Sequence, residues 1–103
     1  MSTNQRVALV TGAGSGIGKA SSLALAAQGF SVVLTGRQID PLNAVAREIE
    51  AQGGTALAVT CDVTSAASVD QLFAETVARF GRLDVLFNNA GRNAGSTPLD
   101  EYD

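Results

Sequence analysis

The sequence contains no histidine and no tryptophan, and it has a single cysteine, Cys61. These absences exclude a metal site built from cysteine and histidine, and also a Ser-His or Cys-His nucleophile pair. One cysteine cannot form an internal disulfide, so we expect a reducing, cytoplasmic compartment. Cys61 is expected to be a small buried apolar residue at the end of a strand.

Positive charge and long apolar runs are also scarce. The net charge is −3, which argues against nucleic acid and anionic membranes as partners. No apolar run approaches the roughly 18–20 residues that span a bilayer. The N-terminal MSTNQR lacks the apolar core of a signal peptide. The 103 residues suit one modest domain with a buried core.

Four short, mostly apolar runs are present instead, at residues 7–11, 31–35, 56–60 and 84–88. Continuous hydrophobicity of this kind is typical of strands buried on both faces of a parallel sheet. The segments between the runs have apolar residues at helical spacing. The resulting order, βαβαβαβ, predicts an α/β fold that forms the first half of a Rossmann-like, doubly wound parallel sheet.

The helical spacing is clearest in two of these segments, and we expect their apolar positions to face the sheet. They are Leu42, Val45, Ala46 and Ile49 in the first segment, and Val69, Leu72, Phe73, Val77 and Phe80 in the second.

Helix ends are also indicated by the sequence. Asp40 is expected to cap a helix whose first residue is Pro41. Gly29, Gly53 and Gly81 stand near predicted helix ends, where a left-handed residue is often needed.

Residues 11–18 read TGAGSGIG and lead from the first strand into a predicted apolar helix with Ile17, Ala20, Ala24 and Ala27. Glycines at such a turn let the chain bend tightly, let a pyrophosphate approach, and let the helix pack closely. The free N–H groups and dipole of a helix N-terminus favour an anion there. We therefore expect a phosphate-binding loop rather than a flexible linker.

Other nucleotide-binding patterns fit this loop less well. The pattern GxxxxGK[ST] fails at Ala13 and Ala20, and the strict GxGxxG pattern fails at Ile17. A methyltransferase-like GxGxG, which would bind S-adenosylmethionine, does fit the glycines. The acidic residues usual in that family are replaced by Val10 and Gly36. It is kept as an alternative.

The pattern TGxxxGIG resembles the glycine motif of the short-chain dehydrogenase/reductase family. It is met by Thr11, Gly12, Gly16, Ile17 and Gly18. Two more family motifs follow: Asp62-Val63, which contacts the adenine in that family, and NNAG at 88–91. All three stand at the C-terminal ends of predicted parallel strands, where ligands bind in such sheets.

The resemblance implies a set of cofactor-binding residues spread over these motifs. They are Gly12, Ser15, Gly16, Ile17, Gly18, Arg37, Asp62, Val63, Asn89, Ala90 and Gly91.

Some of these residues also have purely structural interpretations. Asn88 and Asn89 can end a strand and form a turn. Asp62 can serve only the following helix, with Thr64 or Ser65 as the cap.

The end of the second strand indicates which cofactor is used. An acidic residue there would bind the free 2′-hydroxyl of NAD, but the sequence has Gly36 followed by Arg37. Arginine can contact a phosphate through two hydrogen bonds, and the resemblance favours NADP, with NAD possible. The basic loop residue of some NADP-preferring members is absent, because Ser15 stands there. The alternative is that Arg37 only pairs with a surface acid.

The resemblance implies hydride transfer between the cofactor and a small carbonyl or alcohol substrate. The family's catalytic Tyr-x-x-x-Lys lies in the second half of its fold. The only tyrosine is Tyr102, which stands in an expected helix start, with Thr97 as the cap and Pro98 first. Residues 1–103 are therefore expected to be a partial NAD(P)-binding domain, inactive alone and without catalytic residues. The family also implies a homo-oligomer, a dimer or tetramer. A noncatalytic NADP(H)-binding module is the remaining alternative.

Overall fold

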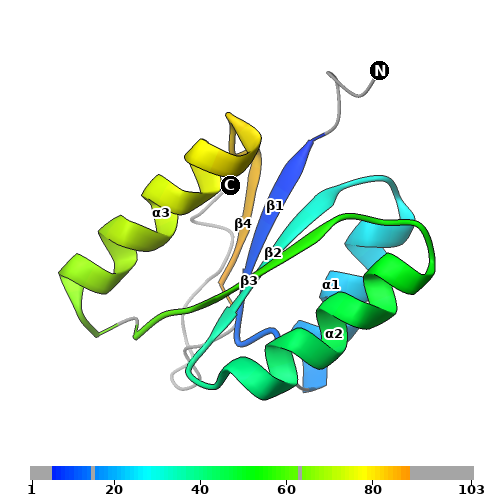
Figure 1. The fold of residues 1–103 in the computed structure, drawn as a ribbon, viewed down its shortest axis with the longest axis horizontal. Helices are drawn as coiled ribbons and strands as arrows, with labels where there is room; N and C mark the ends of the chain where they lie inside the picture. Colours follow the sequence, from blue (N-terminus) through cyan, green and yellow to red (C-terminus); the bar gives the residue numbers. More distant parts are fainter. Residues whose placement is uncertain (1–5, 15, 63, 89–103) are drawn as a thin grey trace.

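The computed structural model describes residues 6–14, 16–62 and 64–88. Strands and helices alternate throughout, as the sequence predicts (Figure 1). The elements are β1 (Val7–Thr11), α1 (Gly16–Ala27), β2 (Ser31–Gly36), α2 (Ile39–Ala51), β3 (Ala56–Thr60), α3 (Ala66–Phe80) and β4 (Val85–Phe87). The second strand is one residue longer than predicted, and the fourth is shorter at both ends.

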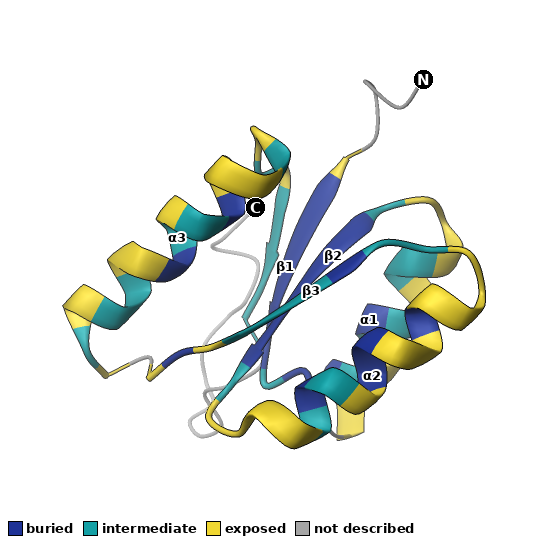
Figure 2. Cartoon of the chain, in the orientation of Figure 1, coloured by how far each residue is buried: buried dark blue, intermediate teal, exposed yellow. Residues whose placement is uncertain are grey.

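The four strands form one parallel sheet in the order β3-β2-β1-β4. In this register Leu9 of β1 stands beside Val33 of β2 on one side and Leu86 of β4 on the other. All five residues of β1 are buried (Figure 2). Burial on both faces explains why this strand is apolar without alternation.

Helices cover both faces of the sheet (Figure 1). Leu34 and Val10 pack with Leu42 and Ile49 of α2 on one face. Leu9 and Val33 pack with Leu72 of α3 on the other. Successive strand residues point to opposite faces, so each strand contributes to both clusters. The predicted doubly wound α/β class is confirmed for this half of the fold.

Helix α2 begins earlier than expected, and the predicted cap is wrong. Its N-cap is Gln38, which accepts no capping hydrogen bond through its side chain, and Asp40 and Pro41 lie inside the first turn. Proline is tolerated there because N–H groups in the first turn have no partner within the helix. The Asp40 carboxylate still stabilises the helix, because it lies in the first turn, near the positive end of the helix dipole.

Helix α3 departs from the expected pattern at one position. Val77 is 53% exposed, whereas its neighbour Thr76 is fully buried. The Thr76 hydroxyl donates to the Leu72 carbonyl at 2.9 Å, which satisfies its polar atom in the core. The buried face therefore runs through Leu72 and Thr76, four residues apart, with Phe73 packed beside them as expected, and Val77 lies outside it.

The predicted apolar side of α1 is also not the buried side. Ile17 is 68% exposed, and Ala20, Ala24 and Ala27 are exposed with it. The residues of α1 that are buried are Gly18 and Ser22. Small side chains on this face let the helix lie close to its neighbours. The Ser22 hydroxyl is satisfied within the helix, because it donates to the Gly18 carbonyl.

The helix ends at Gly29, Gly53 and Gly81 are confirmed by positive φ angles of 99°, 89° and 81°. Alanine would be strained in this left-handed region.

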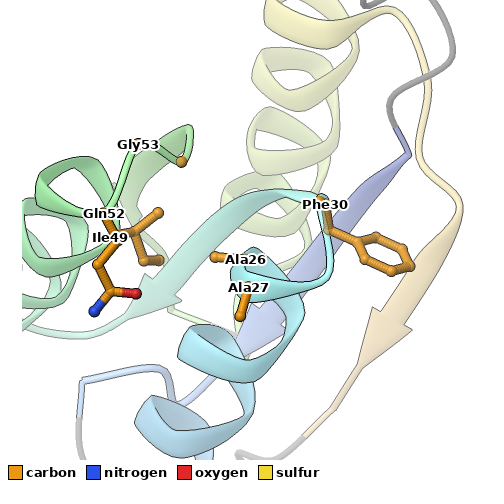
Figure 3. Close-up of a pocket in the computed structure, with 8 residues that line it drawn as sticks. Ala26, Ala27, Phe30, Ile49, Gln52 and Gly53 are labelled. Atoms are coloured by element: carbon orange, nitrogen blue, oxygen red, sulfur yellow. The ribbon is translucent and has the colours of Figure 1, made fainter.

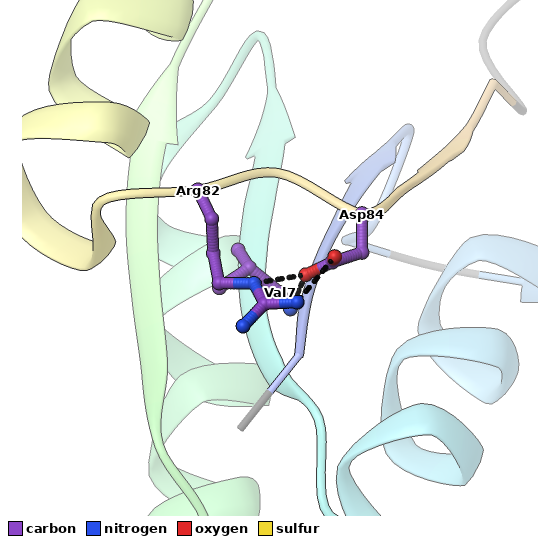
Figure 4. Close-up of polar contacts among 3 residues, drawn as sticks. All are labelled: Val7, Arg82 and Asp84. Atoms are coloured by element: carbon purple, nitrogen blue, oxygen red, sulfur yellow. Dashed lines mark hydrogen bonds and ion pairs between the residues drawn. The ribbon is translucent and has the colours of Figure 1, made fainter. Parts of the chain in front are cut away.

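Strand β4 is joined to β1 at its start by Asp84 (Figure 4). The Val7 N–H donates to Asp84 Oδ2 at 2.8 Å, and the Asp84 N–H donates to the Val7 carbonyl at 2.9 Å. A side-chain oxygen thus replaces a backbone acceptor, so the ladder starts at Val85 and the strand is shorter than predicted. Arg82 donates two hydrogen bonds to the same carboxylate, at 2.9 and 2.8 Å.

These contacts predict a pH dependence of stability. The Arg82 side chain, followed by the Val7 N–H, lowers the pKa of the Asp84 carboxyl. A carboxyl group whose pKa is lower in the folded state stabilises the fold at pH values above its ordinary pKa. That stabilisation is lost as the pH falls through the folded-state pKa. We expect Asp84→Asn to lower the unfolding temperature at pH 7 and to flatten its fall below about pH 4.

Thermal unfolding between pH 7 and pH 3 tests this prediction, with Asp70→Asn on the exposed surface of α3 as the control of equal charge change. An Asp84→Asn curve that parallels the wild-type curve over this range would contradict it.

Candidate functional site

The loop between β1 and α1 turns by means of two left-handed glycines. Gly12 has φ 62° and Gly16 has φ 59°, a region that glycine adopts without steric cost. The Ala13 N–H donates to the Thr35 carbonyl at 3.1 Å, which ties the loop to the end of β2. Two of the predicted cofactor-binding glycines are thus required by the backbone conformation.

Gly18 lets the first turn of α1 rest directly on this loop. A Cβ added to Gly18 would overlap the carbonyl oxygen of Gly12 and lie 2.7 Å from its carbonyl carbon. A Cβ added to Gly14 would lie 2.8 Å from Cβ of Pro41, so α2 packs on the loop as well. At Gly16, by contrast, none of the described residues beyond its own neighbours has an atom within 4 Å of an added Cβ.

The N-terminus of α1 is suited to an anion. The helix begins at Gly16 and has no acidic residue in its first turn, so its free N–H groups and positive dipole end are not opposed by a carboxylate there. Ile17 is exposed beside it, and Ser15 lies outside the described residues. Lys19 turns to α2, where its ammonium lies 3.3 Å from the Glu48 carboxylate.

The end of β2 presents Arg37 to solvent. Within the described part of the chain, no carboxylate lies within 4.0 Å of Arg37, so no surface acid pairs with it there. Its charge still acts on Asp62, whose pKa it helps to lower. The preceding residue, Gly36, accepts a hydrogen bond from the Cys61 N–H at 2.9 Å, which joins the ends of β2 and β3.

Asp62 stands just after β3 in a tight turn. Its Oδ1 accepts from the Thr64 hydroxyl at 2.6 Å and the Thr64 N–H at 2.9 Å. These two hydrogen bonds, and then the charge of Arg37, lower the pKa of the Asp62 carboxyl. The cap of α3 is Ser65, one of the two expected caps, so Asp62 is not itself the N-cap. Val63 lies outside the described residues.

Asn88 follows β4 directly and is tied to β1. The Thr11 hydroxyl donates to Asn88 Oδ1 at 3.0 Å, so the ends of these two strands are joined by side chains. The rest of the predicted NNAG motif, Asn89, Ala90 and Gly91, lies outside the described residues, as does the expected helix start at Thr97.

The parallel sheet brings these strand ends to one edge (Figure 1). The glycine loop, Arg37 and Asp62 therefore share the edge at which ligands bind in open α/β sheets. The left-handed glycines, the open space at Gly16 and the unopposed helix N-terminus fit a dinucleotide with its pyrophosphate at the loop.

Two residues near this edge were missed by the sequence analysis. Thr35 Oγ1 is buried, and within the described residues it has no hydrogen-bond partner. Ser68 lies in the first turn of α3 and accepts from the Asp62 N–H at 3.0 Å. Only the Ser-x-x-Ser spacing at the helix start, which is similar to a capping box, was available as a signal for Ser68.

A hollow of about 160 Å³ lies at the opposite edge of the sheet (Figure 3). The C-terminal ends of α1 and α2 form it, with Ala26, Phe30, Ile49 and Gln52 among its walls. None of the described residues that line it has an ionisable side chain.

Over the described residues, no cluster of three or more His, Cys, Asp or Glu side chains could hold a metal ion. In the same part of the chain, no helix has the length and hydropathy needed to cross a membrane.

Comparison with known proteins gives a consistent result. The family model described as short chain dehydrogenase matches residues 6–103. A 3-oxoacyl-[acyl-carrier-protein] reductase of Synechocystis is 54% identical over 84% of this chain and 35% of its own length. The 7alpha-hydroxysteroid dehydrogenase of Escherichia coli is 40% identical over 92% of this chain and 37% of its own.

Solved structures are similar over the same region. Actinorhodin polyketide ketoreductase with NADPH superposes with a TM-score of 0.84 at 40% identity, over 93% of this chain and 37% of the other. A metagenomic short-chain oxidoreductase in complex with NADP has a TM-score of 0.82 at 44% identity, over 87% and 41%. The chain thus spans little more than a third of the length of the curated relatives it matches.

Proposed function

Since this chain belongs to the short-chain dehydrogenase/reductase family of oxidoreductases, we propose that it is the NADP(H)-binding half of such an enzyme. The carrying observation is the end of β2, where Gly36 replaces an acid and the exposed Arg37 has no paired carboxylate within the described residues. An arginine at this position is suited to the 2′-phosphate of NADP. The complexes with NADP and NADPH among similar structures support this choice.

The residues of this chain would bind and orient the cofactor. The loop of Gly12, Gly16 and Gly18 would hold the pyrophosphate at the N-terminus of α1, and Arg37 the 2′-phosphate. Asp62, beside Val63, would contact the adenine, and 89–91 would line the nicotinamide half. The bound nicotinamide would supply hydride exchange with a small carbonyl or alcohol substrate.

We place the catalytic residues outside these 103 residues, because the sequence contains no Tyr-x-x-x-Lys and the relatives are much longer. Strand β4 also supports this placement. Among the described strands it pairs only with β1, and its three residues, VLF, are apolar and only half buried. Further strands pairing with β4 would cover an edge that is otherwise open to association.

We propose a cytoplasmic homo-oligomer for the intact enzyme.

Ligand binding to the intact protein tests the proposal. We expect NADPH to bind more tightly than NADH, and S-adenosylmethionine not to displace it. NADPH should be oxidised in the presence of carbonyl compounds. Binding without turnover would instead support a noncatalytic module, and displacement by S-adenosylmethionine would support the methyltransferase-like alternative.

A further inference from the structure

The hydroxyl of Ser68 links the first turn of α3 to the end of β3. Ser68 Oγ accepts from the Asp62 N–H at 3.0 Å and donates to Cys61 Sγ at 3.5 Å. A serine hydroxyl has one proton and two lone pairs, so both bonds can exist at once. The Ser68 N–H donates to the capping Ser65 Oγ at 3.2 Å, a backbone bond that is separate from the two bonds of the hydroxyl.

This bond completes the restraint of Asp62. Thr64 fixes the carboxylate through Oδ1, and Ser68 fixes the main chain of the same residue. The residue before it, Cys61, is bonded to the Gly36 carbonyl at the end of β2. Asp62 is exposed, and the described residues supply no hydrogen bond to its Oδ2. That oxygen is therefore available to accept from an amino group.

We propose that Ser68 is a positioning residue for the adenine end of the cofactor site. It acts through Asp62 and does not itself touch the cofactor. The inference rests on the proposed function, in which Asp62 contacts the adenine. Ser68 would hold the Asp62 turn against the end of β2. Asp62, which would contact the adenine, would then keep a fixed position relative to Arg37, which would bind the 2′-phosphate.

The test compares the wild-type protein, Ser68→Ala and Ser65→Ala, all in the intact protein. Ser68→Ala removes the acceptor of the Asp62 N–H, whereas Ser65→Ala removes the cap of the same helix and leaves that acceptor in place. Both are expected to lower the unfolding temperature. Ser68→Ala alone should raise the Kd of NADPH and of 2′,5′-ADP, by about 3- to 10-fold, the effect of one hydrogen bond.

Reduced nicotinamide mononucleotide, which lacks the adenine half, should bind Ser68→Ala and wild type equally. Ser68→Thr, which keeps the hydroxyl, should restore the affinity for 2′,5′-ADP. Equal 2′,5′-ADP affinities for wild type and Ser68→Ala, or equal losses for Ser68→Ala and Ser65→Ala, would overturn the positioning role alone. A wild-type protein that binds neither NADPH nor 2′,5′-ADP would overturn the proposed function, and this inference with it.

Discussion

Gly18→Ala is expected to lower the free energy of unfolding by about 3 kcal/mol or more, the upper end of the usual cost of overpacking. The added methyl group would overlap the Gly12 carbonyl oxygen, and it would lie 3.1 Å from Cα of Ala13. Both neighbours are backbone atoms, so no side-chain rotation can relieve the overlap. Either α1 or the glycine loop must move, and we expect NADPH affinity to fall at least tenfold as the phosphate donors are displaced.

Gly36→Ala is the control for the stability effect. Its added Cβ would lie 3.5 Å from Cδ2 of Leu42, an ordinary contact, and its backbone is not left-handed. We expect its unfolding free energy to stay within about 1 kcal/mol of wild type. Alanine loses less conformational entropy on folding than glycine does, and this small gain offsets any slight crowding at Leu42. Chemical denaturation measures both variants, and equal stability of the two would contradict the close packing of α1 on the loop.

Arg37→Ala is expected to weaken NADPH binding by about 100-fold or more while leaving NADH binding nearly unchanged. The guanidinium would donate two charge-assisted hydrogen bonds to the 2′-phosphate, each contributing about 1.5–3 kcal/mol. NADH has a 2′-hydroxyl there and loses little. Adding Gly36→Asp should reverse the preference, since a carboxylate accepts from the 2′-hydroxyl and repels a phosphate.

Titration of each variant with NADPH and NADH by cofactor fluorescence checks this prediction. Arg47→Ala is the matched control, because Arg47 is exposed on α2 and its loss changes the net charge equally. A loss that is the same for both cofactors, or no greater than that of Arg47→Ala, would rule out a specific contact between Arg37 and the 2′-phosphate.

The sequence was sufficient for the order of elements because buried parallel strands leave an unambiguous apolar signal. It also predicted the left-handed helix ends, since Gly29, Gly53 and Gly81 each follow an apolar helical pattern. Which side of a helix is buried was less predictable. Thr76 is buried because a backbone carbonyl satisfies its hydroxyl, and composition alone assigns that position to the polar surface.

The conformation of the candidate loop was predictable where the backbone requires one residue type, as at Gly12 and Gly16. The role of a side chain was not predictable where it depends on partners that no periodic pattern marks. Ser68 bonds to Asp62 across the turn before α3, only six residues away, and a serine in a first helical turn gives little signal of that role. Asp84 replaces a carbonyl for Val7 from 77 positions away, and that bond depends on tertiary proximity.

The bond between Asp84 and Val7 also has a consequence for synthesis on the ribosome. Its two residues are 77 positions apart in the chain. At typical elongation rates of 5–20 residues per second, Asp84 is made about 4–15 s after Val7. Strand β2 can pair with β1 much earlier, because only α1 separates them. The other edge of β1 therefore waits several seconds for its partner, and the nascent chain is most exposed to mispairing in that interval.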